Sequence, residues 1–343
     1  MKLLRTTRRL LACLPFAVLA AGPVLAQHLT LEGQTGGFLT PTAYVVYSAK
    51  GQFFSYPAVG YHFVNTNSVI GDIHTFSIEE GFANRAEVGY TRSVHIAGDS
   101  TSFSSLWHYS GMNVVNGKAI VLKEGTFVPL MPGFAVGGVV RADDRFVSGA
   151  ANQALTGLLK SYTNGDVFAV ATKTWLHPPF PFLANFGLKF TNASIFGIGG
   201  QSTRFGGRLF GGLGIPLPGP FKTAIVPSAG FTQEPKTSVN LNTLLNAALY
   251  QCEAELACNP ASYSLMSAHV PTTLDYAVRV TQKDNPHFSF DIGVGQVAGN
   301  IGSIYVANPF FNPTNPATGP PIVTTPVNLQ ARSVVGMGLS LRY

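Results

Sequence analysis

Several short segments of the chain alternate between apolar residues and small or polar residues. The alternation runs through "RAEVGYTRS" (85–93), "ANFGLKFT" (184–191), "TTLDYAVRVTQ" (272–282) and "HFSFDIGVGQ" (287–296). Because successive side chains of a β-strand point to opposite faces, each segment predicts a strand with one apolar and one polar face. The charged residues repeatedly fall on the polar face.

The apolar faces need a place to be buried. Charged residues make up 11% of the chain, against roughly 25% in ordinary globular domains. Beyond residue 26 the chain has no run of about 18 apolar residues that would form a transmembrane helix. A closed barrel is the other structure that satisfies its backbone in lipid. The sequence therefore predicts an all-β fold, a closed antiparallel transmembrane β-barrel of the outer-membrane type.

The first 26 residues have the layout of a cleaved signal peptide. A basic start is followed by an apolar stretch and by the small-residue sequence "VLA" before Gln27. Lipidation at Cys13 is the weaker interpretation, since the apolar stretch continues after that residue. The segment holds four of the basic residues that give the chain its formal charge of +6. The mature chain is then close to neutral, which argues against a nucleic-acid partner.

The connections between predicted strands alternate in length. Short, turn-like links ("FANR", "EGTFVPLMP", "LHPPFPFL", "IPLPGP", "KDNP") separate longer loops near 65–72, 95–116, 142–163, 192–203, 234–271 and 298–329. Outer-membrane barrels have short periplasmic turns and longer outer loops. We expect about 12 strands within 56–343, or 14 if "AYVVYS" (43–48) is also a strand. Residues 27–55 form a Gly/Thr-rich segment, which lies either in the periplasm or in the barrel mouth.

The last strand carries a pattern of its own. Its apolar residues recur at every second position and end on an aromatic residue, as in the signal that the barrel assembly machinery recognises. The residues are Val335, Met337, Leu339, Leu341 and Tyr343. Outer-membrane lipid and the assembly machinery are therefore expected partners.

Two cysteines remain after the signal peptide is removed. Cys252 and Cys258 lie close together in "QCEAELACN". In an exported protein such a pair predicts a local disulfide. A zinc site needs two further ligands, and this segment offers no histidine before His269.

Charged residues on the polar faces are expected to line the lumen, because Lys or Arg facing lipid near the midplane costs about 2–4 kcal/mol. Both signs are present, so no strong ion preference is expected. The set forms either a charged constriction that selects solutes or a salt-bridged interior that holds a narrow barrel together. Its members are Glu79, Glu87, Lys123, Lys173, Lys189, Asp275, Arg279, Asp291 and Arg342.

Several stretches resemble the YjbH-like barrels, a family linked to exopolysaccharide biosynthesis in the outer membrane. The segment "LEGQTGGFLTPTAYVVYSAKGQF" (31–53) is similar to the opening of that family, and the hairpin "EEGFANRAEVGYT" (79–91) resembles its repeated hairpin. The resemblance implies envelope transport or polysaccharide export, with no catalytic residues to carry over. This chain is shorter than the large members of the family.

The sequence offers little for catalysis or for a cofactor. No serine lies in a Gly-x-Ser-x-Gly elbow, no His-x-x-x-His pair occurs, and "GIGGQSTR" (197–204) lacks the lysine of a phosphate loop. The prediction is a non-enzymatic, porin-like channel of the outer membrane for small polar solutes. The alternatives are a structural or polysaccharide-export barrel with a closed lumen, an outer-membrane hydrolase, and a soluble periplasmic β-sandwich.

Overall fold

The structure, a computed structural model, is described here for the parts of the chain whose positions are defined. These are residues 28–66, 71–97, 111–143, 163–176, 181–193, 201–235, 239–240, 267–268, 272–282, 287–298, 300–307, 314–315, 317, 322–328 and 333–342. Within these ranges no helix is long and apolar enough to cross a membrane.

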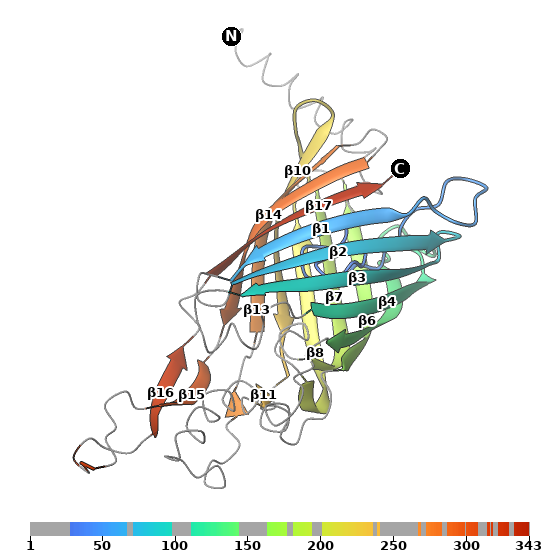
Figure 1. The fold of residues 1–343 in the computed structure, drawn as a ribbon. Coiled ribbons are helices and arrows are strands. Elements are labelled where there is room, and N and C mark those ends of the chain that lie inside the picture. The colour runs from blue at the N-terminus through green and yellow to red at the C-terminus, as the bar shows by residue number, and fades with distance from the viewer. Residues whose placement is uncertain are drawn as a thin grey trace, which may run out of the picture.

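Twelve antiparallel strands form a closed ring (Figure 1). The first and last strands close it over eight residue pairs, from Ala58↔Arg342 to Asn65↔Val335. The predicted closed barrel of 12 strands is confirmed. In order around the ring the strands are β1 (Ala58–Asn65), β2 (Gly71–Phe82), β3 (Ala86–Ala97), β4 (Gly111–Leu122), β5 (Gly133–Asp143), β6 (Asn164–Trp175), β7 (Phe182–Ala193), β8 (Gln201–Gly214), β10 (Thr223–Gln233), β13 (Thr272–Gln282), β14 (His287–Ala298) and β17 (Ser333–Arg342).

Shorter strands lie in the connections. β9 (Leu217–Pro218) pairs with β10, and β11 (Val239–Asn240) pairs with both β8 and β12 (Ser267–Ala268). β15 (Asn300–Ala307) and β16 (Ile322–Asn328) form a separate hairpin between β14 and β17. None of these adds a strand to the ring.

The two ends of the barrel differ in their connections, as the sequence predicts. At one end the links between neighbouring strands are 83–85, 123–132, 176–181, 215–222 and 283–286. We call this the short-turn end, and the opposite end the long-loop end. The β2–β3 link is a tight turn in which Ala83 and Asn84 have positive φ angles. Residues 43–48 form no strand, so the expected alternative of 14 strands is not what the chain adopts.

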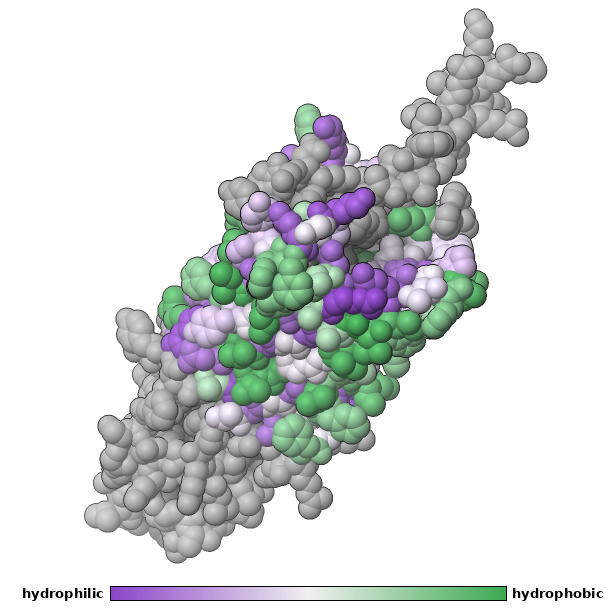
Figure 2. Space-filling model, turned by 90° about the vertical axis from the view of Figure 1, so that its right-hand side faces the viewer, coloured by the Kyte–Doolittle hydropathy of each residue, from purple (hydrophilic) through white to green (hydrophobic). Residues whose placement is uncertain are grey.

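The outer wall of the ring is apolar. Large hydrophobic side chains are exposed on nearly every strand, among them Phe76, Val136, Leu188, Tyr276 and Ile292. Figure 2 shows green, hydrophobic residues spread over one side of this wall. On β17, Val335 and Met337 are exposed and Leu339 and Leu341 partly so, whereas Ser340 and Arg342 on the opposite face are buried. This band is the surface that a closed barrel presents to lipid.

The inward faces are mostly polar. Threonine, serine, asparagine and charged side chains follow one another along the wall, as in Thr75, Ser77 and Glu79 of β2, all buried. A ring of eight strands is just filled by its own side chains, and larger rings leave space inside. With its 12 strands, this barrel has a lumen that its wall alone does not fill.

Candidate functional site in the barrel lumen

Residues 28–48 occupy the lumen. We call this segment the plug. Its side chains are almost all buried, and His28, Leu29, Thr30 and Thr35 are at most 1% exposed. In Figure 1 the blue trace of the segment runs inside the ring of strands. Residues 27–55 were expected either in the periplasm or in the barrel mouth. The plug, which makes up most of this segment, lies within the barrel.

The plug folds back on itself as a compact loop. Antiparallel bridges join Leu29 to Thr35 and Gly36 to Pro41. At its tip the backbone N–H of Thr30 donates to the Gln34 carbonyl over 2.7 Å. Gly33 has φ of 91° there, and a Cβ at this position would lie 2.4 Å from Thr91 Oγ1. Glycine therefore permits both the turn and its close approach to β3.

Glu87 on β3 holds the plug at two points along its length. Its carboxylate accepts hydrogen bonds from the Thr35 N–H (3.0 Å), the Thr35 hydroxyl (2.6 Å) and the Val46 N–H (2.9 Å). Lys118 on β4 lies 2.9 Å from the same carboxylate and donates to the Thr35 carbonyl over 2.8 Å. Bonds to a charged acceptor are the stronger class of hydrogen bond. Glu87 is thus the main anchor of the plug.

Glu32, at the tip of the plug, binds Arg141 on β5. The Arg141 Nε contacts Glu32 Oε1, and Nη2 donates to Glu32 Oε2 over 2.8 Å, so the pairing is bidentate. Nη2 also donates to Asp166 Oδ2 on β6 over 2.6 Å. The Arg141 side chain is fully buried. This cluster lies near the long-loop end, where β5 ends and β6 begins.

The beginning of the plug is held by β14. His28 Nε2 lies 2.8 Å from Asp291 Oδ2, and His28 Nδ1 lies 3.1 Å from the Ser289 hydroxyl. Burial lowers the pKa of His28 and so disfavours the charged form of its ring. Arg279 completes the cluster with a bidentate pair to Asp291 (2.9 and 3.0 Å) and a bond to the Gly36 carbonyl.

Ser289, His28 and Asp291 are hydrogen-bonded in the order of a hydrolase triad, which bears on the enzyme alternative. Ser289 is buried, with 6% of its surface exposed. A triad requires its nucleophile to reach a substrate. The arrangement joins the plug to the wall and presents no accessible serine.

Both ends of the plug are at the short-turn end. Ser48 exchanges hydrogen bonds with Asn84 of the β2–β3 turn (2.7 and 2.8 Å). The Tyr44 hydroxyl donates to Glu124 in the β4–β5 link. His28, at the other end of the plug, binds residues near the start of β14. The plug therefore enters and leaves through the same opening, with Glu32 reaching toward the other.

Apolar contacts supplement these polar ones. Ala43 lies in a buried cluster with residues of β4, β5, β6 and β8, including Met112, Val139 and Phe168. Leu29 and Val46 pack with Ala58, and Leu31 packs with Val64 and Ile73. Inward-facing apolar residues of this kind were not expected from the alternation.

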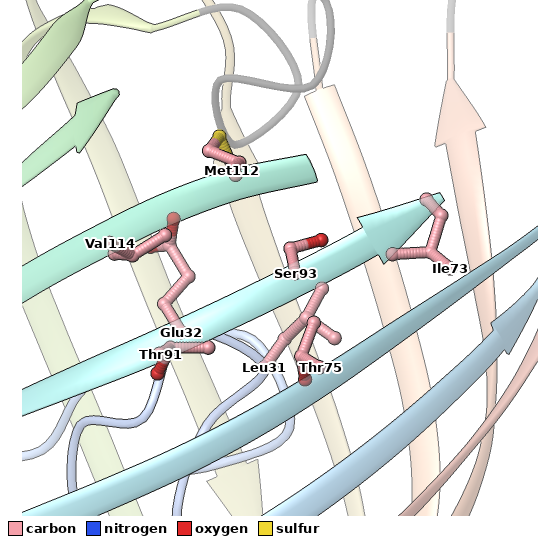
Figure 3. Close-up of a pocket in the computed structure, with 8 residues that line it drawn as sticks. All are labelled: Leu31, Glu32, Ile73, Thr75, Thr91, Ser93, Met112 and Val114. Atoms are coloured by element: carbon pink, nitrogen blue, oxygen red, sulfur yellow. The ribbon is translucent and has the colours of Figure 1, made fainter. Parts of the chain in front are cut away.

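Two of the small cavities among the described residues border the plug. One, of about 10 Å³, lies between the tip and strands β2–β4 and is lined by Leu31, Glu32, Thr75, Ser93 and others (Figure 3). The other, of about 40 Å³, lies between Gly36–Thr42 and strands β7, β8, β10 and β13. A single water needs roughly 10–15 Å³ of such space. Neither cavity admits more than a few waters.

The structure places most of the expected lumen residues inside the barrel. Their side chains are buried on inward faces: Glu79, Glu87, Lys189, Asp275, Arg279, Asp291 and Arg342. Lys173 is partly exposed at the short-turn mouth, where it lies 2.7 Å from Glu124 Oε1. Lys123 differs from the expectation: β4 ends at Leu122, so its alternation does not extend to Lys123, whose side chain is exposed.

The charged residues of the site that were not anticipated include Glu32, Lys118, Arg141 and Asp166. The last three lie in alternating stretches of β4, β5 and β6, and the same alternation places them inside. Glu32 gives no such signal, because the plug has no periodicity. Cys252, Cys258, Tyr343 and the signal peptide lie outside the described residues, so the disulfide, the terminal aromatic and the cleavage remain predictions.

No protein-family model and no curated protein matches the chain. Solved structures with some likeness include the KdgM porin in complex with disordered oligogalacturonate, with 9% identity, a TM-score of 0.41, and coverage of 83% of this chain and 99% of that one. OprB from Pseudomonas putida has 10% identity and a TM-score of 0.30, over 79% and 59% of the two chains. Wzi from Escherichia coli, a carbohydrate-binding β-barrel, has 9% identity and a TM-score of 0.25, over 83% and 55%.

All three TM-scores are below 0.5, and such likeness implies neither a shared substrate nor a shared mechanism. The resemblance to YjbH-like barrels is not shown by these comparisons and remains a prediction.

Proposed function

We propose that the protein is a porin-like, non-enzymatic channel of the outer membrane for small polar solutes, and that its plug holds the channel closed. The observation that carries the proposal is the binding of residues 28–48 to the lumen wall. Polar side chains of the wall make most of the specific contacts with the plug, through Glu87, Lys118, Arg141, Arg279 and Asp291. Without the plug, these groups would face a water-filled passage.

The path of the plug supports a reversible closure. Because both of its ends lie at the short-turn end, the plug can leave the lumen without a strand of the ring opening. In an outer-membrane barrel that end faces the periplasm. The closed-lumen structural barrel is the competing function, and it requires the plug to stay in place permanently.

Deletion of residues 28–48 tests the proposal. The mature chain and the deletion variant are refolded, their barrels are verified by heat-dependent gel mobility, and single-channel conductance is recorded in planar bilayers. The full chain is expected to be silent or to open rarely, and the deletion variant to give large, stable conductance steps. Silence from a correctly folded deletion variant would refute the channel and leave the structural barrel.

A further inference from the structure

The tip of the plug fills a site on the wall that has the chemistry of a carboxylate receptor. Arg141 presents Nε and Nη2 to both oxygens of Glu32. Such fork-to-fork pairing is the geometry in which arginine recognises carboxylates with most specificity. Glu32 is the one acidic residue in segment 28–55, and it comes from the plug, not from the wall.

When the plug leaves, the wall does not fully satisfy Arg141 by itself. Its remaining partners are Asp166, through Nη2, and Asn164, whose Oδ1 lies 3.4 Å from Nη1. Nε and the Nη2 proton that bind Glu32 would then face the lumen. The charges of Arg141 and Asp166 balance, and Lys189 on β7 also interacts electrostatically with Asp166, so the site without Glu32 keeps directed donors beside a further positive charge.

Hydroxyl groups lie beside this site. The cavity at the tip of the plug is lined by Glu32 and by Thr75, Thr91 and Ser93, as Figure 3 shows. Thr75 is 3% exposed, and its hydroxyl has no hydrogen-bond partner among the described residues. Buried hydroxyls normally have one. This unpaired hydroxyl lines the same cavity as Glu32, and it suits a ligand that carries further polar groups besides a carboxylate.

We propose that Arg141 is a binding site for small carboxylate solutes, and that Glu32 of the plug occupies this site while the channel is closed. The proposal rests on the proposed function, since solutes reach Arg141 only when the plug has left. A carboxylate that binds only the unplugged barrel also favours that state, because binding shifts an equilibrium toward the form that binds. The channel would therefore preferentially pass small organic acids.

The experiment uses the plug-deleted barrel (residues 28–48 removed), with propionate as the probe because it carries the carboxylate of a glutamate side chain. Propionate is expected to reduce the single-channel chloride current in a saturable manner, and its neutral analogue propionamide is expected to have no effect. Arg141→Gln should raise the half-blocking propionate concentration by at least about tenfold, the scale of one lost charge-assisted pair. The matched control Arg208→Gln, which changes a half-buried arginine of β8, should leave the block unchanged.

The outcomes separate the two proposals. A barrel that conducts but shows no propionate block, or a block that Arg141→Gln leaves intact, overturns the carboxylate site and leaves the channel standing. A block that Arg208→Gln removes in place of Arg141→Gln likewise overturns it. A folded barrel that does not conduct overturns both. Heat-dependent gel mobility confirms the fold of each variant before it is recorded.

Discussion

Glu87→Gln is expected to open the channel. The substitution keeps the size of the side chain but removes the charge that faces Lys118. It also replaces one acceptor oxygen with an NH2 group, which cannot accept the hydrogen bonds that Thr35 or Val46 donates to that oxygen. Hydrogen bonds to a charged acceptor contribute about 1.5–3 kcal/mol each. The bonds from Thr35 and Val46 exist only while the plug is in place, whereas the Glu87–Lys118 pair lies within the wall, so the open fraction should rise by roughly tenfold or more.

Single-channel recording of refolded protein measures this open fraction. Glu80→Gln is the matched control, since its carboxylate bonds to Ser55 outside the plug, and it should behave as the unmodified chain does. A folded Glu87→Gln barrel that stays as closed as the parent would contradict the role of Glu87 as the main anchor.

Gly81→Val is expected to displace the last part of the plug by steric overlap alone. A Cβ on Gly81 would lie 2.1 Å from the carbonyl oxygen of Val46. Real Cβ atoms do not approach backbone oxygens so closely, and neither strand β2 nor the plug backbone can move aside as a flexible side chain would. Overpacking of this kind costs about 1–3 kcal/mol or more. No charge changes, so the substitution tests packing independently of Glu87.

Hydrogen–deuterium exchange of the peptide that contains residues 40–48 reports the displacement. Exchange there should become at least about tenfold faster, in proportion to a loss of roughly 1.4 kcal/mol, while the strand amides stay protected. Gly117→Ala is the control, because its nearest contact would be an ordinary 3.6 Å to the Glu87 carbonyl. Unchanged exchange in Gly81→Val would mean that the plug does not lie against β2 as described.

The ring of strands was predictable from the sequence because each strand carries its own signal. A lipid-facing wall requires apolar side chains at every second position, so β7, β13 and β14 can be recognised without knowledge of their neighbours. The alternation of short and long links then indicates the number of strands. The same period of two predicts the C-terminal strand. It also places Asp291 and Arg279 on inward faces.

The plug was not predictable in this way. Its residues show no period, because each binds a different strand at a different depth. The partners are also far apart in the chain: Glu32 and Arg141 are separated by 109 positions, and His28 and Ser289 by 261. Lys123 shows the opposite failure, since alternation alone cannot tell where a strand ends. The sequence therefore predicted a charged lumen but left open whether that lumen was open or filled.

The most direct test of the closure is a reversible disulfide between the plug and the wall. The Ala43 N–H donates to the Thr172 hydroxyl over 2.7 Å, which brings the two residues within the reach of a disulfide, for which Cα atoms lie about 4.4–6.8 Å apart. Ala43→Cys and Thr172→Cys are combined with Glu87→Gln, and single-channel current is recorded before and after reductant is added. Glu87→Gln without the cysteine pair serves as the control for effects of the reductant itself.

We expect a barrel that is silent while oxidised and gives stable conductance steps once reduced. Steps of equal size and frequency in the oxidised protein would show that current does not depend on withdrawal of the plug, and would contradict the proposed closure.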